Sequence, residues 1–101
     1  MKIRFRWDPL KAASNLRKPG VSFETAARAF ADPFALTEHD GVVGGEHRWR
    51  TLGVVEGFFL ILVAHSSLDE DEDGQQVEII RIISARAADR KERRRYEQES
   101  R

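Results

Sequence analysis

The sequence predicts an α+β domain: a mainly antiparallel β-sheet of about four to five strands, with two N-terminal helices and one C-terminal helix. Two observations predict this class. Short segments with alternating or continuous apolar residues are typical of strands. Apolar residues between Phe23 and Phe30 follow helical spacing, and the residues from Ala85 to Tyr96 have the composition of a charged helix. At 101 residues, the chain can bury one modest core, so we expect a single domain over residues 1–101.

The N-terminal residues predict one strand and one helix. Lys2 to Arg6 alternates basic and apolar side chains, which is typical of a half-buried strand. Asp8 is a favourable N-cap, and Pro9 is tolerated at the first helical position because its missing N–H would have no partner there. The helix is expected to end near Arg17, since Pro19 disfavours helical geometry at the residue before it.

A second short helix is expected to follow, with Ser22 as its N-cap. Four apolar side chains of this helix fall on one stripe: Phe23, Ala26, Ala27 and Phe30. Asp32 and Pro33 end the helix. We expect both helices to cover one face of the sheet.

The middle of the chain predicts strands. Phe34 to His39 is expected to be a short strand, followed by a glycine-rich turn over residues 40–45. Phe58 to Ala64 is apolar without alternation, which indicates a central strand that is buried on both faces.

His47 to Val54 and Phe58 to Ser66 predict a hairpin around a turn at residues 56–57. If this turn has two residues, Arg48 lies opposite His65. A slip of one residue would change that pairing.

The C-terminal third predicts a strand that leads into a helix. Val77 to Ser84 is rich in isoleucine, and β-branched side chains pack well in sheets. The helix is expected from about Arg86 to Gln98. Leu68 to Gln76 includes five consecutive acidic residues (69–73), and we expect a solvated loop there. Its contiguous carboxylates lack the ligand spacing of an EF-hand, so a calcium site is not expected.

The charges are unevenly distributed, although the net charge is zero. Residues 1–20 carry +5 and residues 81–101 carry +4, whereas residues 21–65 carry −3 and residues 66–80 carry −6. This distribution predicts separate anion-binding and cation-binding surfaces, or simply solvated faces.

Composition and missing motifs exclude several classes of function. The chain has no cysteine, which excludes disulfides and thiolate metal sites and fits a reducing cytoplasm. Its longest apolar run is far short of the roughly 20 residues of a membrane span. It has no nucleotide-binding glycine loop, and His39, His47 and His65 lack metal-ligand spacing. We therefore expect a cytoplasmic protein with no membrane association, no cofactor and no metal.

The remaining candidate site is a group of arginines. Arg48 and Arg50 are two residues apart and project from one face of their strand. Arg81 comes from the strand after next, and Arg86 is expected on the last helix with Tyr96. Arginine binds phosphate through its planar fork, so these residues could bind RNA. Alternatively, the arginines pair with glutamates such as Glu46 and Glu78, or with the acidic loop.

Motifs at both ends of the chain resemble the BrnT toxin family. The matching residues are Phe5-x-Trp7-Asp8-Pro9, Lys11, Asn15, Lys18-Pro19-Gly20-Val21-Ser22-Phe23-Glu24, Phe30-x-Asp32-Pro33, Glu46-x-Arg48, Leu52-Gly53, Arg81-Ile82-Ile83-Ser84-Ala85-Arg86-x-Ala88, Glu92 and Tyr96. The resemblance implies a RelE-like fold and a metal-independent ribonuclease that inhibits translation. It also implies a BrnA-like antitoxin partner, of ribbon-helix-helix type, in a heterotetramer that contacts DNA only through the antitoxin.

The resemblance places four residues among the expected catalytic positions: Arg48, Arg81, Arg86 and Tyr96. RNA contacts are expected from four others: Lys18, Trp49, Arg50 and His65. At position 19, the family pattern usually has histidine where this chain has proline. This difference favours an alternative, in which the chain is a catalytically degenerate module that still binds the antitoxin.

Overall fold

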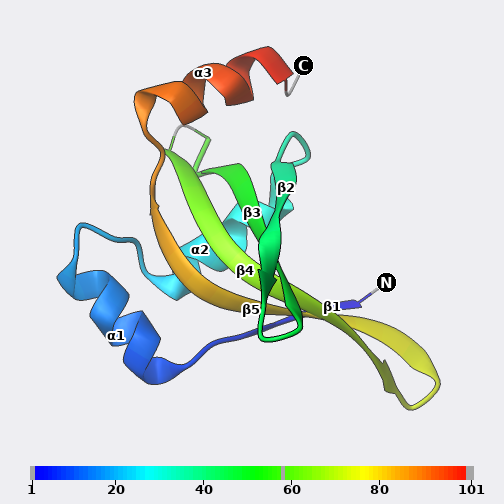
Figure 1. The fold of residues 1–101 in the computed structure, drawn as a ribbon. Coiled ribbons are helices and arrows are strands. Elements are labelled where there is room, and N and C mark those ends of the chain that lie inside the picture. Colours follow the sequence, from blue (N-terminus) through cyan, green and yellow to red (C-terminus); the bar gives the residue numbers. More distant parts are fainter. Residues whose placement is uncertain (1, 58, 100–101) are drawn as a thin grey trace.

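The computed structural model describes residues 2–57 and 59–99. These residues form one five-stranded sheet, three α-helices and one short 3₁₀ helix (Figure 1). The strands are β1 (Lys2–Arg6), β2 (Leu36–Val43), β3 (Glu46–Val55), β4 (Phe59–Glu72) and β5 (Gln75–Ala87). The helices are α1 (Pro9–Arg17), α2 (Phe23–Arg28) and α3 (Arg90–Glu99), and η1 (Ala29–Ala31) continues α2. The predicted α+β class is confirmed.

The sheet has the strand order β1-β5-β4-β3-β2. All neighbouring strands are antiparallel except β1 and β5, which run parallel. The predicted central strand is therefore confirmed as β4, whose residues Leu60 to Val63 are buried. Asp8 and Ser22 cap α1 and α2 as expected, because their side chains accept hydrogen bonds from Leu10 N and Thr25 N.

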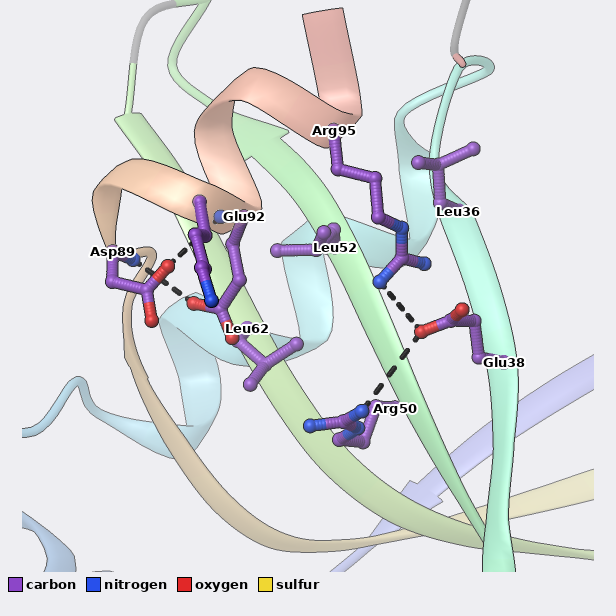
Figure 2. A pocket seen from close by; sticks show the side chains of 9 residues that line it. Leu36, Glu38, Arg50, Leu52, Leu62, Asp89, Glu92 and Arg95 are labelled. Atoms are coloured by element: carbon purple, nitrogen blue, oxygen red, sulfur yellow. Dashed lines mark hydrogen bonds and ion pairs between the residues drawn. The ribbon is translucent and has the colours of Figure 1, made fainter. Parts of the chain in front are cut away.

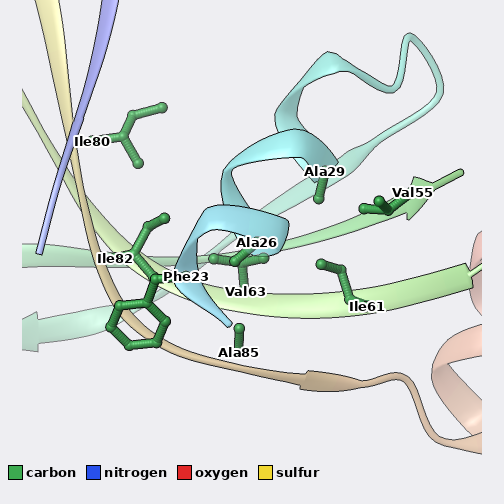
Figure 3. Packing of buried hydrophobic residues seen from close by; sticks show 9 residues of the cluster. All are labelled: Phe23, Ala26, Ala29, Val55, Ile61, Val63, Ile80, Ile82 and Ala85. Carbon is green, nitrogen blue, oxygen red and sulfur yellow. The ribbon is translucent and has the colours of Figure 1, made fainter. Parts of the chain in front are cut away.

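The main core lies between one face of the sheet and α2 (Figure 3). Its buried residues are Phe23, Ala26, Ala29, Val55, Ile61, Val63, Ile80, Ile82 and Ala85. Gly53 lets the helical segment approach β3 closely, since a Cβ there would lie 2.4 Å from the Ala29 carbonyl oxygen. No helix within residues 2–57 and 59–99 has the length and apolarity needed to cross a membrane.

A second, smaller apolar cluster lies on the opposite face, at the end that α3 covers. Leu52, Leu60 and Leu62 are buried there, and Tyr96 of α3 packs against them. In Figure 1, α3 crosses the end of the sheet, whereas α2 lies behind the strands. Within the described residues, no helix covers the rest of this second face, which we call the open face.

The acidic segment is not a loop, so this prediction was wrong. β4 continues to Glu72 and β5 begins at Gln75, which leaves a tight turn at Asp73-Gly74 with φ of 52° and 83°. Asp-Gly favours such hairpin turns because both residues tolerate positive φ. Two of the acidic side chains also pair with arginines of β1, since Glu72 lies 2.8 Å from Arg4 and Glu70 lies 3.6 Å from Arg6.

Several element boundaries also differ from the predictions, and β5 is longer at both ends than the predicted strand from Val77 to Ser84. β2 continues to Val43, through a bulge between His39 and Val42, and the turn is confined to residues 44–45. α3 begins at Arg90 rather than near residue 86. Asp89 and Glu92 form a reciprocal capping box, in which each backbone N–H donates to the other side chain at 2.9 and 2.8 Å.

The β3–β4 register differs from the pairing that a two-residue turn would give. Val55 pairs with Phe59, so Arg48 lies opposite Ser66 and Trp49 lies opposite His65. The expected pairing of Arg48 with His65 was therefore wrong by one residue.

Asn15 attaches α1 to the part of β5 that β1 does not reach. Its amide Nδ2 donates to the carbonyl oxygens of Val21 and Ala85, both at 2.8 Å. Its Oδ1 accepts from Ala85 N at 3.3 Å. Val21 N also donates to Ala85 O. The backbone N–H and carbonyl of Ala85 at this edge of β5 therefore have hydrogen-bond partners without another strand.

Replacing Asn15 with alanine is expected to lower the free energy of unfolding by about 2 kcal/mol, because buried backbone groups at Ala85 and Val21 would lose partners. Urea unfolding followed by circular dichroism measures the change. Lys11→Ala, at an exposed position of the same helix, is the control and should change stability by less than about 0.5 kcal/mol. Equal midpoints for the two variants would contradict this role of Asn15.

Candidate functional site

A row of polar side chains crosses four strands on the open face. The strand register pairs Arg6 with Arg81, Arg81 with Ser66, and Ser66 with Arg48. Residues that are directly opposite in neighbouring strands project from the same face. These four residues therefore form one line, which we call the arginine row. The small side chain of Ser66 separates Arg81 from Arg48.

A β-bulge brings Arg86 onto the same face as the arginine row. The β4–β5 register shifts between Ala64, which pairs with Ser84, and His65, which pairs with Ile82. Arg81 and Arg86 are five residues apart, so a regular strand would direct them to opposite faces. The additional residue at the bulge shifts the alternation of side chains by one, so Arg86 projects from the same face as Arg81. Arg86 lies on β5 and not on α3, so its predicted location on the helix was wrong.

Glu46 connects two members of the arginine row. Its Oε1 lies 2.5 Å from Arg81 Nη2 and 3.6 Å from Arg48 Nε. Burial raises the pKa of Glu46, but the Ser66 hydroxyl and the two guanidinium groups together hold it below its ordinary value. Glu46 is therefore a carboxylate at neutral pH. The alternative that Arg48 and Arg81 pair with Glu46 is confirmed, and it is compatible with a binding site.

The other arginines of the open face also have acidic neighbours. Arg86 makes a two-point contact with Glu92, at 2.7 and 2.9 Å. Arg50 lies 3.7 Å from Asp40 and 3.9 Å from Glu38. Arg50 Nε is buried but has no hydrogen-bond partner among the described residues. Arg48 Nε is likewise buried without a hydrogen-bond partner among the described residues. The cations are therefore held near acidic neighbours, and two of their donors form no hydrogen bond within the described protein.

A cavity of about 270 Å³ lies between α3 and the open face. Figure 2 shows leucines of three strands at its base and charged side chains around them. The lining residues are Leu36, Glu38, Arg50, Leu52, Leu62, Asp89, Lys91, Glu92 and Arg95. Arg50 is therefore shared by the cavity and the arginine-rich surface.

Tyr96 lies at the far end of the open face. Its hydroxyl donates to Asp32 Oδ2, which also accepts a hydrogen bond from Val54 N. Val54 is six residues beyond Arg48 on β3, which corresponds to about 20 Å along a strand. Burial and the hydrogen bond with Asp32 raise the pKa of Tyr96 to about 12. Tyr96 thus remains protonated at neutral pH, and the structure does not bring it to the arginine row.

Trp49 and His65 project from the opposite face of the sheet. His65 is 4% exposed, its Nε2 lies 2.8 Å from Thr51 Oγ1, and its ring packs against Phe30. Burial lowers the pKa of His65, so the imidazole is neutral at pH 7. Trp49 and His65 line a separate cavity of about 370 Å³ on that face. The structure does not bring these two residues together with the arginines.

Lys18 and Pro19 lie in a third depression, of about 330 Å³, beside the end of β5. Ser84 and Arg86 line the same depression. The residue at position 19 is therefore a neighbour of Arg86. Among residues 2–57 and 59–99, no three His, Asp or Glu side chains are arranged to hold a metal ion.

This arrangement is that of a small α+β protein, in which α1 and α2 lie on one face of a five-stranded sheet while arginines and α3 occupy the other. The chain belongs to the BrnT toxin family: residues 7–92 match the family described as "Ribonuclease toxin, BrnT, of type II toxin-antitoxin system". The predicted resemblance is confirmed.

A solved structure with a similar fold is the crystal structure of the Brucella abortus ribonuclease toxin BrnT. The TM-score is 0.59 and the sequence identity is 20%, over 89% of this chain and 100% of that chain. At this identity, the comparison shows that the fold is shared. No curated protein matches the chain.

Three residues of the candidate site were not identified as such from the sequence: Arg6, Glu46 and Ser66. The alternation of Lys2 to Arg6 indicates that Arg6 shares a face with Arg4, but not which strand it adjoins. Glu46 stands two residues before Arg48 and so projects from the same face. That spacing was a usable signal for Glu46.

Replacing Tyr96 with phenylalanine is expected to lower the free energy of unfolding at pH 7 by about 1–2 kcal/mol, because the Asp32 carboxylate loses a hydrogen-bond donor. Although burial raises the pKa of Asp32, hydrogen bonds from Tyr96, Val54 and Phe34 bring it below its ordinary value. A lowered pKa stabilises the fold above the unfolded-state pKa, and this contribution is lost as the pH falls.

The difference between the wild-type protein and Tyr96→Phe should therefore shrink when the pH is lowered from 7 to about 3, where an ordinary aspartate becomes protonated. Urea unfolding at the two pH values measures this change. An undiminished difference at the lower pH would show that the hydroxyl stabilises the fold through something other than the Asp32 carboxylate.

Proposed function

We propose that this protein is a metal-independent endoribonuclease that inhibits translation by cleaving RNA on the open face of its sheet. The observation that carries the proposal is the arginine row, in which Arg6 and Arg81 lie on neighbouring strands and Arg48 lies one strand beyond Ser66. Neighbouring strands are about 5 Å apart, so the guanidinium groups can contact one phosphate or two successive phosphates. Membership in a ribonuclease toxin family supports this function.

The proposed reaction is an internal transfer at one RNA phosphate. The ribose 2′-oxygen attacks the adjacent phosphorus, so that an O2′–P bond forms and the P–O5′ bond breaks. The products are a 2′,3′-cyclic phosphate and a 5′-hydroxyl end, which takes a proton from the solvent. Arg48 and Arg81 stabilise the negative charge that develops on the phosphoryl oxygens, and Arg86 binds a neighbouring phosphate.

We assign the general base to Glu46. Its carboxylate contacts both Arg48 and Arg81, so a phosphate held by these arginines lies close to it. The lowered pKa keeps Glu46 ionised at neutral pH, as a proton acceptor must be. Glu46 accepts the 2′-hydroxyl proton while the O2′–P bond forms.

The other predicted residues have supporting roles or no role in this mechanism. Lys18 and Arg50 extend the cationic surface along the RNA. Tyr96 was predicted among the catalytic positions, and we assign it a positioning role through Asp32 and α3. RNA contacts of Trp49 and His65 remain a prediction that this mechanism does not require.

We further propose that a BrnA-like antitoxin of ribbon-helix-helix type neutralises the protein in a heterotetramer. The family description as a type II toxin–antitoxin toxin supports an antitoxin partner. Acidic residues of the antitoxin would cover the arginine row, where they would compete with RNA phosphates. Contact with DNA would occur only through the antitoxin.

The second candidate function is a degenerate toxin that binds its antitoxin without cleaving RNA. One observation favours it: Pro19, which stands where the family usually has histidine, lines the same depression as Arg86. A proline has no side-chain group that could transfer a proton there.

Induced expression in bacteria is expected to arrest growth and to degrade RNA, as seen on a gel. Arg81→Ala should reduce the rate of RNA cleavage in vitro by about 10²–10³-fold, because one charge-stabilising group is lost. The variant should remain folded, since Arg81 is exposed and its ion pair contributes little to stability. Arg17→Ala, at an exposed position of α1, is the control and should leave cleavage unchanged.

Normal growth and intact RNA at high expression of the wild-type protein would contradict the ribonuclease proposal. If the purified wild-type protein nevertheless binds its antitoxin, and Pro19→His gains cleavage, the degenerate module is the correct function. Unfolding of Arg81→Ala would instead identify Arg81 as a structural residue.

Replacing Glu46 with glutamine is expected to lower kcat by about 100-fold, because the amide cannot accept the proton. KM should stay the same or fall, since a negative charge next to the RNA phosphate is removed. Glu72→Gln is a matched control, because Glu72 also pairs with an arginine and also has a lowered pKa, but lies near the Asp73-Gly74 turn.

Cleavage rates measured with a fluorescent oligoribonucleotide give both constants for each variant. The lowered pKa of Glu46 also means that the wild-type kcat should not fall between about pH 8 and pH 6, where this carboxylate remains ionised. A similar kcat for Glu46→Gln and Glu72→Gln would exclude Glu46 as the base.

A further inference from the structure

We infer that the cavity beneath α3 is a guanine-binding subsite next to the arginine row. As a determinant of RNA specificity, the subsite rests on the proposed function, but binding of guanine itself does not require RNA cleavage. Three features support this subsite: the apolar base of the cavity, the hydrogen-bonding groups around it and its position relative to Arg48.

The cavity has an apolar base against which an aromatic ring can pack. Its base consists of Leu36, Leu52 and Leu62, which come from three neighbouring strands and pair in register, so they form an apolar floor. Leu52 and Leu62 are 2% and 9% exposed. The N-terminal half of α3 covers this floor (Figure 2). A base would contact Leu36 and the small exposed parts of Leu52 and Leu62, while its polar edges face the charged groups of the rim.

Carboxylates on two sides of the cavity have unused acceptor oxygens. Asp89 accepts a hydrogen bond from Glu92 N through Oδ1. Both ion pairs of Glu38, with Arg95 at 2.7 Å and with Arg50 at 3.9 Å, involve Oε1. Within the described residues, neither Asp89 Oδ2 nor Glu38 Oε2 accepts a hydrogen bond from the protein. A carboxylate here can accept from two adjacent N–H donors of a base.

Cations on the rim supply the complementary donors. Arg50, Lys91 and Arg95 line the cavity. Arginine and lysine bind the O6 and N7 acceptors of guanine. Guanine combines this acceptor pair with the adjacent N1–H and N2–H donors. Adenine, cytosine and uracil lack that combination, so a cavity with both carboxylates and cations favours guanine.

The distance between the cavity and the arginine row also supports a subsite for a base of the bound RNA. Arg48, Arg50 and Leu52 are every second residue of β3 and lie on the same face, so each is about 7 Å from the next along the strand. A guanine above Leu52 would place its own phosphate near Arg50 and an adjacent phosphate toward Arg48. This geometry predicts cleavage next to guanosine.

Nucleotide binding to the intact protein tests the inference. The four 5′-monophosphates GMP, AMP, CMP and UMP are titrated separately while the leucine methyl signals are followed by NMR. GMP should bind at least tenfold more tightly than the other three and should shift the methyl signals of Leu36, Leu52 and Leu62. The methyl signals of Leu68, which is 62% exposed on the same strand as Leu62, should not shift.

Two variants link the binding to the cavity. Leu62→Trp should fill the cavity and abolish GMP binding, whereas Leu68→Trp, the matched control on β4, should leave it unchanged. Glu38→Gln changes an exposed residue and is expected to fold normally, so it provides a second test. It should reduce the preference for GMP over AMP at least threefold, because one acceptor for the N–H donors becomes an amide.

The outcomes are separable from those of the proposed function. Equal binding of the four nucleotides, or methyl shifts away from the three leucines, would overturn the guanine subsite even if RNA is cleaved. An unchanged preference in Glu38→Gln would do the same. Selective GMP binding at the cavity by a protein that leaves RNA intact would support the subsite and contradict the ribonuclease mechanism.

Discussion

The register of β5 against β4 is the constraint on which the candidate site depends. β5 pairs with β4 along nearly its whole length, with β1 along residues 77–81, and with Asn15 and Val21 beyond the bulge. Ile80 and Ile82 are buried in the core on the helix-covered face, which fixes this register because a slip would expose them. The same anchoring holds Arg81 on the open face. The bulge then returns Arg86 to that face, so one strand supplies two cations of the site.

Local signals in the sequence predicted most of the elements, whereas the relations between distant strands could not be predicted. Asp8 and Ser22 specify the starts of two helices through their own side chains, and the apolar run in β4 indicates a central strand. The position of Arg6 depends instead on a parallel pairing with residues about 75 positions away. The bulge in β5 has no glycine or proline to indicate it. The Asp73-Gly74 turn could have been predicted from the sequence, but the surrounding acidic residues favoured the prediction of a loop.

The arrangement of charges on the open face also depends on the pairing of strands that are far apart in the sequence. The sequence showed basic ends and an acidic middle, which suggested two separate surfaces. The fold instead places Glu46 between Arg48 and Arg81, and Glu92 against Arg86. Exposed ion pairs of this kind stabilise a fold by only about 0–1 kcal/mol. A phosphate can therefore displace or share such contacts at low cost, while the carboxylates keep the guanidinium groups oriented before the ligand arrives.

The helix α3 connects the cavity with Arg86 on the open face. Asp89 and Glu92 form its N-terminal capping box, and both carboxylates also line the cavity. Glu92 at the same time holds Arg86 through two hydrogen bonds. A base that binds in the cavity would contact the residues that position both α3 and Arg86. Base recognition and phosphate binding would then share one set of hydrogen bonds. A base that does not fit the cavity would therefore also disturb the position of Arg86, and with it the binding of the phosphate.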